Sequence, residues 1–166
     1  MTHPHPRLVA QARLTTPLGP MTAAATAQGL AGLWFDGQAH HPGPLETPVE
    51  ASQRWLRAAQ AALDAYFAGR KMALPPLDLH GTPFQRAVWQ ALLTITPGST
   101  RSYGALAQGL QRPAAMRAVG AAVGRNPVSV LVPCHRVLGA GGALTGYAGG
   151  LDRKRALLAL EGALPA

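Results

Sequence analysis

The sequence predicts an α+β fold, with a small antiparallel sheet and one helix in the first half and mostly helices in the second. Short strand-like segments occupy the first 35 residues, and helical periodicity begins at residue 49. A connector containing Pro75-Pro76 separates this first half from the mostly helical second half. The chain has 166 residues, 48% of them hydrophobic, which is enough to bury the core of one domain or of two small ones. We therefore expect an N-terminal α/β domain over residues 1–79 and a C-terminal domain over residues 80–166.

Three short strands are expected at the start of the chain, over residues 7–14, 21–28 and 30–35. The turn signals at residues 17–20 and at Gly29 separate them, which favours an antiparallel meander. Residues 37–48 form a loop that contains His40 and His41, and without further ligands these indicate a solvated loop rather than a metal site. Apolar residues at helical spacing predict a helix over residues 49–69, followed by the connector over residues 70–80.

The second half opens with a strong helix start. Thr82 can cap the helix, Pro83 suits its first turn, and Gln85 can complete a capping box. One apolar stripe then predicts a helix that ends at Pro97-Gly98; its members are Phe84, Val88, Leu92 and Ile95.

A helix-turn-helix is predicted next. Ser102 can cap a helix over residues 103–110, a short turn follows, and a second helix covers residues 114–125 before Asn126-Pro127 stops it. The second helix is rich in Ala and Gly, which permits either close approach to a partner or tight packing inside the protein. Beyond it we expect a buried strand over residues 128–132, a glycine-rich loop over residues 139–150 and a final helix over residues 151–162.

Positive charge is concentrated in the second half. Residues 80–166 carry nine Arg or Lys against two Asp or Glu, whereas residues 1–79 carry six against five. This asymmetry favours a nucleic-acid partner for the second half over ordinary surface charge that maintains solubility. The chain has no apolar run of about 18 residues and no apolar signal core at its start, so we expect neither a membrane partner nor export.

Cys134 is the single cysteine, so the chain can form neither an internal disulfide nor a multi-cysteine zinc site, and the reducing cytoplasm is the expected setting. A lone cysteine is usually a small buried apolar residue. Here Pro133 precedes it and His135 and Arg136 follow, and a nearby imidazole or positive charge favours the nucleophilic thiolate. Glu161 could orient His135 as in a catalytic triad, or it could be a surface charge near a helix end.

The run PCHRV at residues 133–137 resembles the active-site motif of the O-6-alkylguanine-DNA alkyltransferases, the methylated-DNA–protein-cysteine methyltransferases. Further motifs follow in the family's order across residues 80–162: GTPFQ with VW, SYGALA, RAVG followed by NP, LTGYAGG and LLALEG. Residues 1–79 match only in outline. The family's I-P-x-G is replaced by ITPG at residues 95–98, and the N-terminal half has no cysteines for the zinc that some relatives bind.

The resemblance implies that the first domain has a ribonuclease H-like fold. It also implies a reaction that each protein molecule performs only once. Cys134 would accept the alkyl group from O-6-alkylguanine, with O-4-alkylthymine left open as a second substrate. His135 and Glu161 would activate the thiol through a water-bridged relay, and Asn126 would brace the turn before the active-site strand. No cofactor and no metal are implied. The implied partner is double-stranded DNA containing alkylated guanine, bound by a monomer.

The resemblance also implies how the DNA is held. The helix-turn-helix would enter the minor groove and flip out the damaged base, with Tyr103 against the flipped guanine and Arg117 in the gap it leaves. The remaining DNA contacts would come from Arg101, Arg112, Ala118 and Arg125. The guanine pocket would be formed by Cys134, Val137, Tyr147, Ala148 and Gly149, with the Cys134 and Val137 carbonyls accepting from the guanine amino group.

Three other functions compete with this one. A non-catalytic module that recognises alkylated DNA would lack the cysteine, and the intact PCHRV run argues against it. A helix-turn-helix transcription regulator would need a dimerisation segment, and a cysteine hydrolase would need a distant histidine with an oriented Asn or Asp. Neither feature is evident in the sequence.

Overall fold

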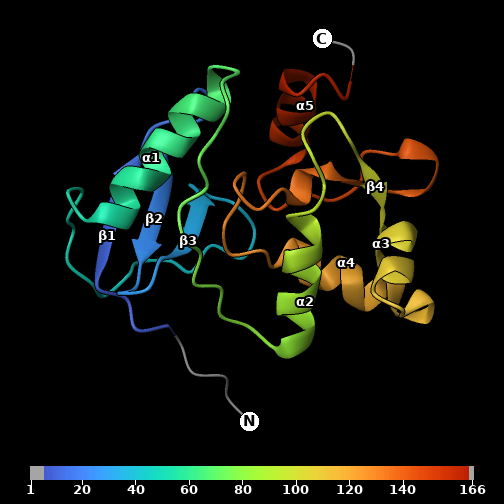
Figure 1. The fold of residues 1–166 in the computed structure, drawn as a ribbon, viewed down its shortest axis with the longest axis horizontal. Helices are drawn as coiled ribbons and strands as arrows, with labels where there is room; N and C mark the ends of the chain where they lie inside the picture. Colours follow the sequence, from blue (N-terminus) through green and yellow to red (C-terminus); the bar gives the residue numbers. More distant parts are fainter. Residues whose placement is uncertain (1–5, 165–166) are drawn as a thin grey trace. The chain divides into compact units, whose positions relative to one another are not determined.

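The structure, a computed structural model, describes residues 6–164 and confirms the α+β fold class (Figure 1). The chain divides into two compact units. The first runs up to His80 and also includes Pro127–Leu131, and the second consists of Gly81–Asn126 together with the chain from Val132 onward. None of the helices in the described part of the chain has the length and apolar character needed to cross a bilayer.

The first unit is built on the predicted meander. Strands β1 (Ala10–Leu14), β2 (Met21–Ala25) and β3 (Leu30–Phe35) pair antiparallel in the order β1-β2-β3, and helix α1 (Arg54–Phe67) lies along the sheet (Figure 1). Both sheet edges are covered by isolated bridges: Gln11 pairs with Val49, and Leu30 and Leu33 pair with Leu77 and Val128. The largest buried side chains of this unit are Met21, Leu30, Leu33, Phe35, Leu56 and Leu63.

Helix α1 starts five residues later than predicted. The Gln11 amide donates to the Pro48 carbonyl at 2.9 Å, and the Glu50 amide donates to the Gln11 carbonyl at the same distance. These sheet-edge hydrogen bonds keep residues 48–50 extended, which periodicity alone does not reveal. The helix then begins after Gln53, whose side chain accepts from the Trp55 and Leu56 amides.

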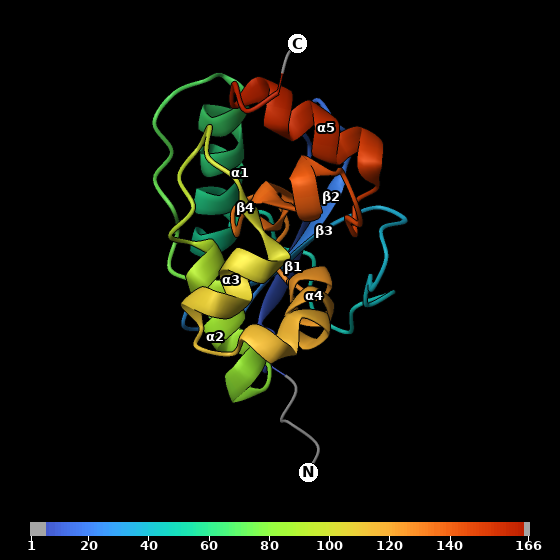
Figure 2. The same cartoon turned by 90° about the vertical axis from the view of Figure 1, so that its right-hand side faces the viewer.

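The α-helices in the described part of the second unit are α2 (Pro83–Leu92), α3 (Tyr103–Gly109), α4 (Met116–Gly124) and α5 (Leu151–Leu160). The predicted capping box is confirmed, because Thr82 and Gln85 exchange side-chain and backbone hydrogen bonds of 3.0 Å. Helices α3 and α4 lie side by side, as a helix-turn-helix requires (Figure 2). Buried Trp89 on α2 donates through its indole nitrogen to the Ala122 carbonyl of α4 at 2.8 Å.

Short elements complete the second unit. Three-residue 3₁₀ helices cover Pro113–Ala115, Cys134–Arg136 and Ala140–Gly142. Strands β4 (Arg101–Ser102) and β5 (Val137–Leu138) form a parallel pair that the sequence analysis did not anticipate. Helix α2 ends at Leu92 rather than at Pro97-Gly98. The Thr94 hydroxyl donates to the Ala91 carbonyl at 2.7 Å, a local bond that competes with continued helix.

The predicted strand over residues 128–132 is wrong. Val128 makes only an isolated bridge to Leu33, and the chain then turns sharply, with the Leu131 amide donating to the Ser129 carbonyl at 2.9 Å. Val130 has φ = 72°, a left-handed conformation that no regular strand accommodates and that costs a β-branched residue about 1–3 kcal/mol. The segment is nevertheless buried, so its apolar composition reflects burial rather than strand structure.

Candidate active site

Cys134 begins the short 3₁₀ helix that follows Pro133, and it is buried. Its backbone amide donates to the Val132 carbonyl at 2.8 Å. The same Val132 carbonyl accepts from the side-chain amide of Asn126 at 2.8 Å. Asn126, buried just beyond the end of α4, therefore joins the second helix of the helix-turn-helix to the segment that carries the cysteine. This segment is a turn and not the strand that the sequence analysis expected.

Burial raises the pKa of the Cys134 thiol from 9.0 to about 11. A hydrogen bond from Asn126 and the positive charge of Lys154 oppose this shift without overcoming it. The groups that favour the thiolate are Asn126 and Lys154, rather than the adjacent His135 and Arg136 from which the sequence analysis expected this effect. At neutral pH the group is a thiol, so a nucleophilic reaction at this site needs a base to remove its proton.

His135, which pairs with Glu161, is the candidate for such a base. The His135 Nε2 atom lies 2.7 Å from Oε1 of Glu161, and the two side chains are 0% and 2% exposed. Burial lowers the pKa of His135, although the Glu161 carboxylate opposes this, so the imidazole is neutral at pH 7. Because a carboxylate only accepts hydrogen bonds, Nε2 carries the proton and Nδ1 is the basic nitrogen. The two residues that the sequence analysis paired are brought together here.

Arg136 has a different place from the one expected for it. Its Nε and Nη2 atoms donate to the two carboxylate oxygens of Glu161 at 2.9 and 2.8 Å, and Nη1 donates to the Ile95 carbonyl. The guanidinium therefore orients the carboxylate that orients His135. The sequence alone shows only a positive charge beside the thiol, because the carboxylate partner of Arg136 lies 25 residues away.

Lys154 on α5 was missed altogether. Its side chain is fully buried, and Nζ donates to the carbonyls of Val137 at 2.6 Å and of Thr145 and Gly146 at 3.0 Å. Burial lowers the pKa of this ammonium, while the negative charge that Cys134 carries as a thiolate opposes the shift. Its position three and four residues before the buried Leu157 and Leu158 places it on the inner face of α5, a sequence signal that the surrounding charged residues concealed.

A cavity of about 410 Å³ opens between α3, α4 and the start of the glycine-rich loop. Tyr103 lines it, with its hydroxyl donating to the Thr145 carbonyl at 3.4 Å, and burial raises its pKa. The other lining residues are Ser102, Gly104, Met116, Arg117, Gly120, Gly139 and Ala140. The cavity walls are largely backbone and short side chains, which suits a flat aromatic ligand.

The remaining residues of the expected guanine pocket lie in the loop beside the cysteine. The Tyr147 ring stands edge-on to the His135 ring with centroids 6.5 Å apart, and Gly149 is buried while Ala148 is half-buried. The Val137 carbonyl already accepts from Lys154, and the Cys134 carbonyl accepts from the Val137 amide. Each carbonyl oxygen has a second lone pair, so it could accept a hydrogen bond from a guanine amino group in addition to the one from its existing donor.

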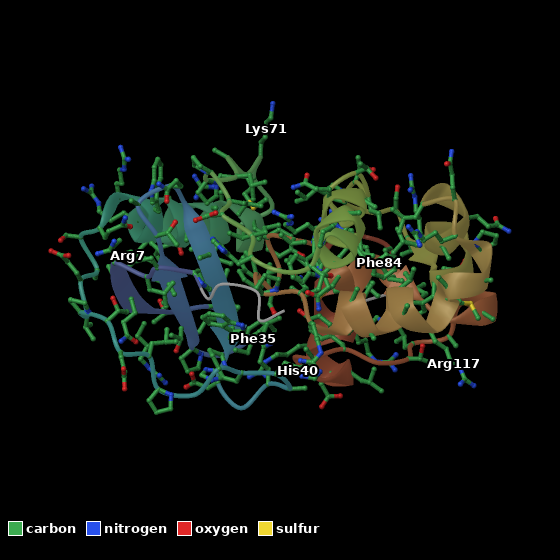
Figure 3. The ribbon with its side chains drawn as sticks, turned by 90° about the horizontal axis from the view of Figure 1, so that it is seen from below. Arg7, Phe35, His40, Lys71, Phe84 and Arg117 are labelled. Carbon is green, nitrogen blue, oxygen red and sulfur yellow. The ribbon has the colours of Figure 1, made fainter. Side chains whose placement is uncertain are left out.

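The expected DNA-binding residues are all on the surface of the second unit. Arg117 projects away from the ribbon near the start of α4 (Figure 3). The Arg112 guanidinium lies 5.8 Å from the centre of the Phe84 ring. Also exposed are Arg101, Arg112, Ala118 and Arg125. Across residues 6–164, no group of three or more His, Cys, Asp or Glu side chains is placed to hold a metal ion.

Family models match most of the chain. Residues 11–80 match the model described as 6-O-methylguanine DNA methyltransferase, ribonuclease-like domain. Residues 83–163 match the model described as 6-O-methylguanine DNA methyltransferase, DNA binding domain.

Individual proteins agree with the family models. The methylated-DNA–protein-cysteine methyltransferase of Mycobacterium bovis is 48% identical over 150 residues, which is 89% of each chain. That of Methanosarcina acetivorans is 46% identical over 149 residues, covering 89% of this chain and 94% of its own. The crystal structure of Mycobacterium tuberculosis OGT in complex with DNA superposes with a TM-score of 0.83 at 46% identity, covering 93% of both chains.

Proposed function

The chain belongs to the methylated-DNA–protein-cysteine methyltransferase family, and on this premise we propose that Cys134 is the acceptor for the alkyl group of O-6-alkylguanine in DNA. The protein is a methyltransferase of direct-reversal DNA repair. The observations that carry the assignment are the burial of Cys134 and the buried His135–Glu161 pair, whose histidine directly follows the cysteine in the sequence. Glu161 holds Nε2 of His135 at 2.7 Å, and Asn126 hydrogen-bonds the thiol itself.

The transfer is a single displacement. His135 takes the proton of the Cys134 thiol through a water-bridged relay, and the sulfur attacks the alkyl carbon. The sulfur–carbon bond forms as the carbon–oxygen bond to guanine breaks, and the departing guanine takes the electron pair of that bond and receives the proton from His135. Lys154 and Asn126 stabilise the thiolate as it forms, since both lower the pKa of the thiol.

The product is a thioether, which has no ready leaving step. The sequence contains no second cysteine that could take over the group, so each molecule acts once. The alternative of a non-catalytic damage-recognition module is disfavoured, because such a module would not need a thiol with a base and an orienting carboxylate.

DNA binding is assigned to the second domain, residues 80–166, and the ribonuclease-like domain comprises residues 1–79. Alkylated guanine pairs poorly, so flipping it into the pocket beside Tyr103 has a reduced cost, and Arg117 fills the gap. Sequence-independent phosphate contacts come from Arg101, Arg112 and Arg125. Because the acceptor must stay reduced, the cytoplasm is the compartment that suits this protein.

Cys134→Ala tests the assignment. The variant should transfer no alkyl group from an O-6-methylguanine duplex while binding that duplex nearly as well as the original protein, since the arginines that hold DNA are unchanged. Methyl transfer to the protein at the original rate in Cys134→Ala would contradict it. Loss of both transfer and duplex binding would show that the thiol acts through folding rather than as acceptor.

A further inference from the structure

Met116 departs from the small-residue composition of α4. It is the first residue of this helix, directly before Arg117, and 52% of it is exposed. Among the described residues of the helix-turn-helix it is the one large apolar side chain with such exposure. A methionine in this position loses contact with water only when another molecule covers it.

The surroundings of Met116 indicate what that molecule is. Met116 lines the same cavity as Tyr103 and Arg117, and its Sδ atom rests over α3, 3.7 Å from where a Cβ on Gly104 would be. Gly120, one turn along the same face of α4, leaves room for the Tyr103 ring. Met116 therefore packs against α3 on one side and is exposed on the other, where it borders the same cavity as Arg117.

Charge and chemistry at this face favour DNA over a protein partner. Residues 80–166 carry nine Arg or Lys against two Asp or Glu, which favours a polyanion. The minor groove presents the apolar edges of deoxyriboses, and proteins that deform this groove often insert Phe, Leu, Ile, Met or Pro between base steps. A flexible thioether suits a surface whose shape varies with sequence.

We propose that Met116 is a positioning residue that packs against the deoxyriboses and base step next to the extruded nucleotide. It keeps the groove open beside the gap, so that Arg117 can enter. This inference rests on the proposed function, because it needs a flipped base. Met116 is then the apolar member, and Arg117 the charged member, of a two-residue wedge that enters the DNA beside the extruded nucleotide.

The test compares Met116→Ala with Met116→Leu on two substrates, an O-6-methylguanine duplex and free O-6-benzylguanine. Met116→Ala should lower the transfer rate at subsaturating duplex about five-fold, the factor expected when the burial of roughly half of a methionine side chain against DNA is lost. Met116→Leu should restore it. Because Met116 also lines the cavity beside Tyr103, reaction with the free base serves as the reference, and its rate should fall much less than the duplex rate in Met116→Ala. Leu74→Ala, at a residue 40% exposed in the connector, is the matched control and should change neither rate.

Salt dependence distinguishes an apolar contact from a phosphate contact. Met116→Ala should weaken duplex binding by the same factor at low and high salt, because it releases no counterion, whereas Arg112→Ala should reduce the salt slope by about one. A base analogue that fluoresces when unstacked, placed beside the alkylated guanine, should show less unstacking with Met116→Ala.

Two results would overturn the inference while leaving the proposed function intact. One is a duplex rate for Met116→Ala equal to that of the original protein. The other is an equal loss on duplex and free base, which would make Met116 a packing residue of the pocket. Failure of the unmodified protein to alkylate Cys134 from duplex would instead remove the proposed function itself.

Discussion

Replacing Glu161 with Gln tests the buried network around the acceptor. The carboxylate accepts two hydrogen bonds from Arg136 and one from His135, and the Arg136 side chain is only 8% exposed. Glu161→Gln leaves that guanidinium buried without its counter-charge. Breaking a buried ion pair costs about 3–5 kcal/mol of unfolding free energy. The amide oxygen of the glutamine can still accept one hydrogen bond from Arg136, so we expect a loss of about 3 kcal/mol. For a chain of this size the melting temperature should fall by roughly 6–12 °C.

Stability and chemistry can then be separated by a second substitution. Arg136→Met in the Glu161→Gln background removes the orphan charge and should recover most of the lost stability, because neither partner of the pair remains. In both variants the transfer rate should stay about 100-fold or more below that of the original protein, because His135 lacks its carboxylate partner. Thermal melting and single-turnover transfer from duplex provide the two measurements. A double variant that recovers the transfer rate with its stability would refute the role of Glu161 in activating His135.

Three further predictions concern the DNA contact, the product and the thiol. Arg117→Ala should slow repair of duplex more than reaction with a free benzylated guanine base, because a wedge matters only when a base leaves a stack; equal losses would argue against it. The alkylated protein should melt about 2–8 °C below the free form in calorimetry, since an added group overpacks the closed site around Cys134; an unchanged midpoint would contradict this. Above pH 9 an unfolded thiol releases its proton while the folded one, with a pKa of about 11, retains it, so the unfolding free energy should fall with pH. Urea titrations between pH 8 and 11 should show this loss, up to about 1.4 kcal/mol per pH unit, and a Cys134→Ala variant with the same slope would contradict it.

Local signals in the sequence were sufficient for much of the fold. The Thr82 capping box, the Ser102 cap and the turn at Gly29 each depend on residues a few positions apart, so their chemistry can be recognised directly. The PCHRV run likewise indicated Cys134 and His135 as candidate site residues without any tertiary information.

Features that depend on distant residues were not accessible in this way. Helix α1 starts late because residues 48–50 bind the edge of β1, and the run at residues 128–132 pairs with β3 only at Val128 before the chain turns. Arg136 pairs with a carboxylate 25 positions away, and Lys154 reaches three carbonyls from the inner face of α5. The thiol pKa could not be inferred from neighbouring charges, because the dominant cause is burial.

The central claim is that Cys134 accepts one alkyl group and is then spent. Mass spectrometry of the intact protein and of its Cys134 peptide, after incubation with excess O-6-methylguanine duplex, tests it most directly. We expect one methyl group per active protein molecule, located on Cys134, with a plateau that longer incubation does not raise. A methyl group on another residue, or more repaired guanine than protein, would contradict the account.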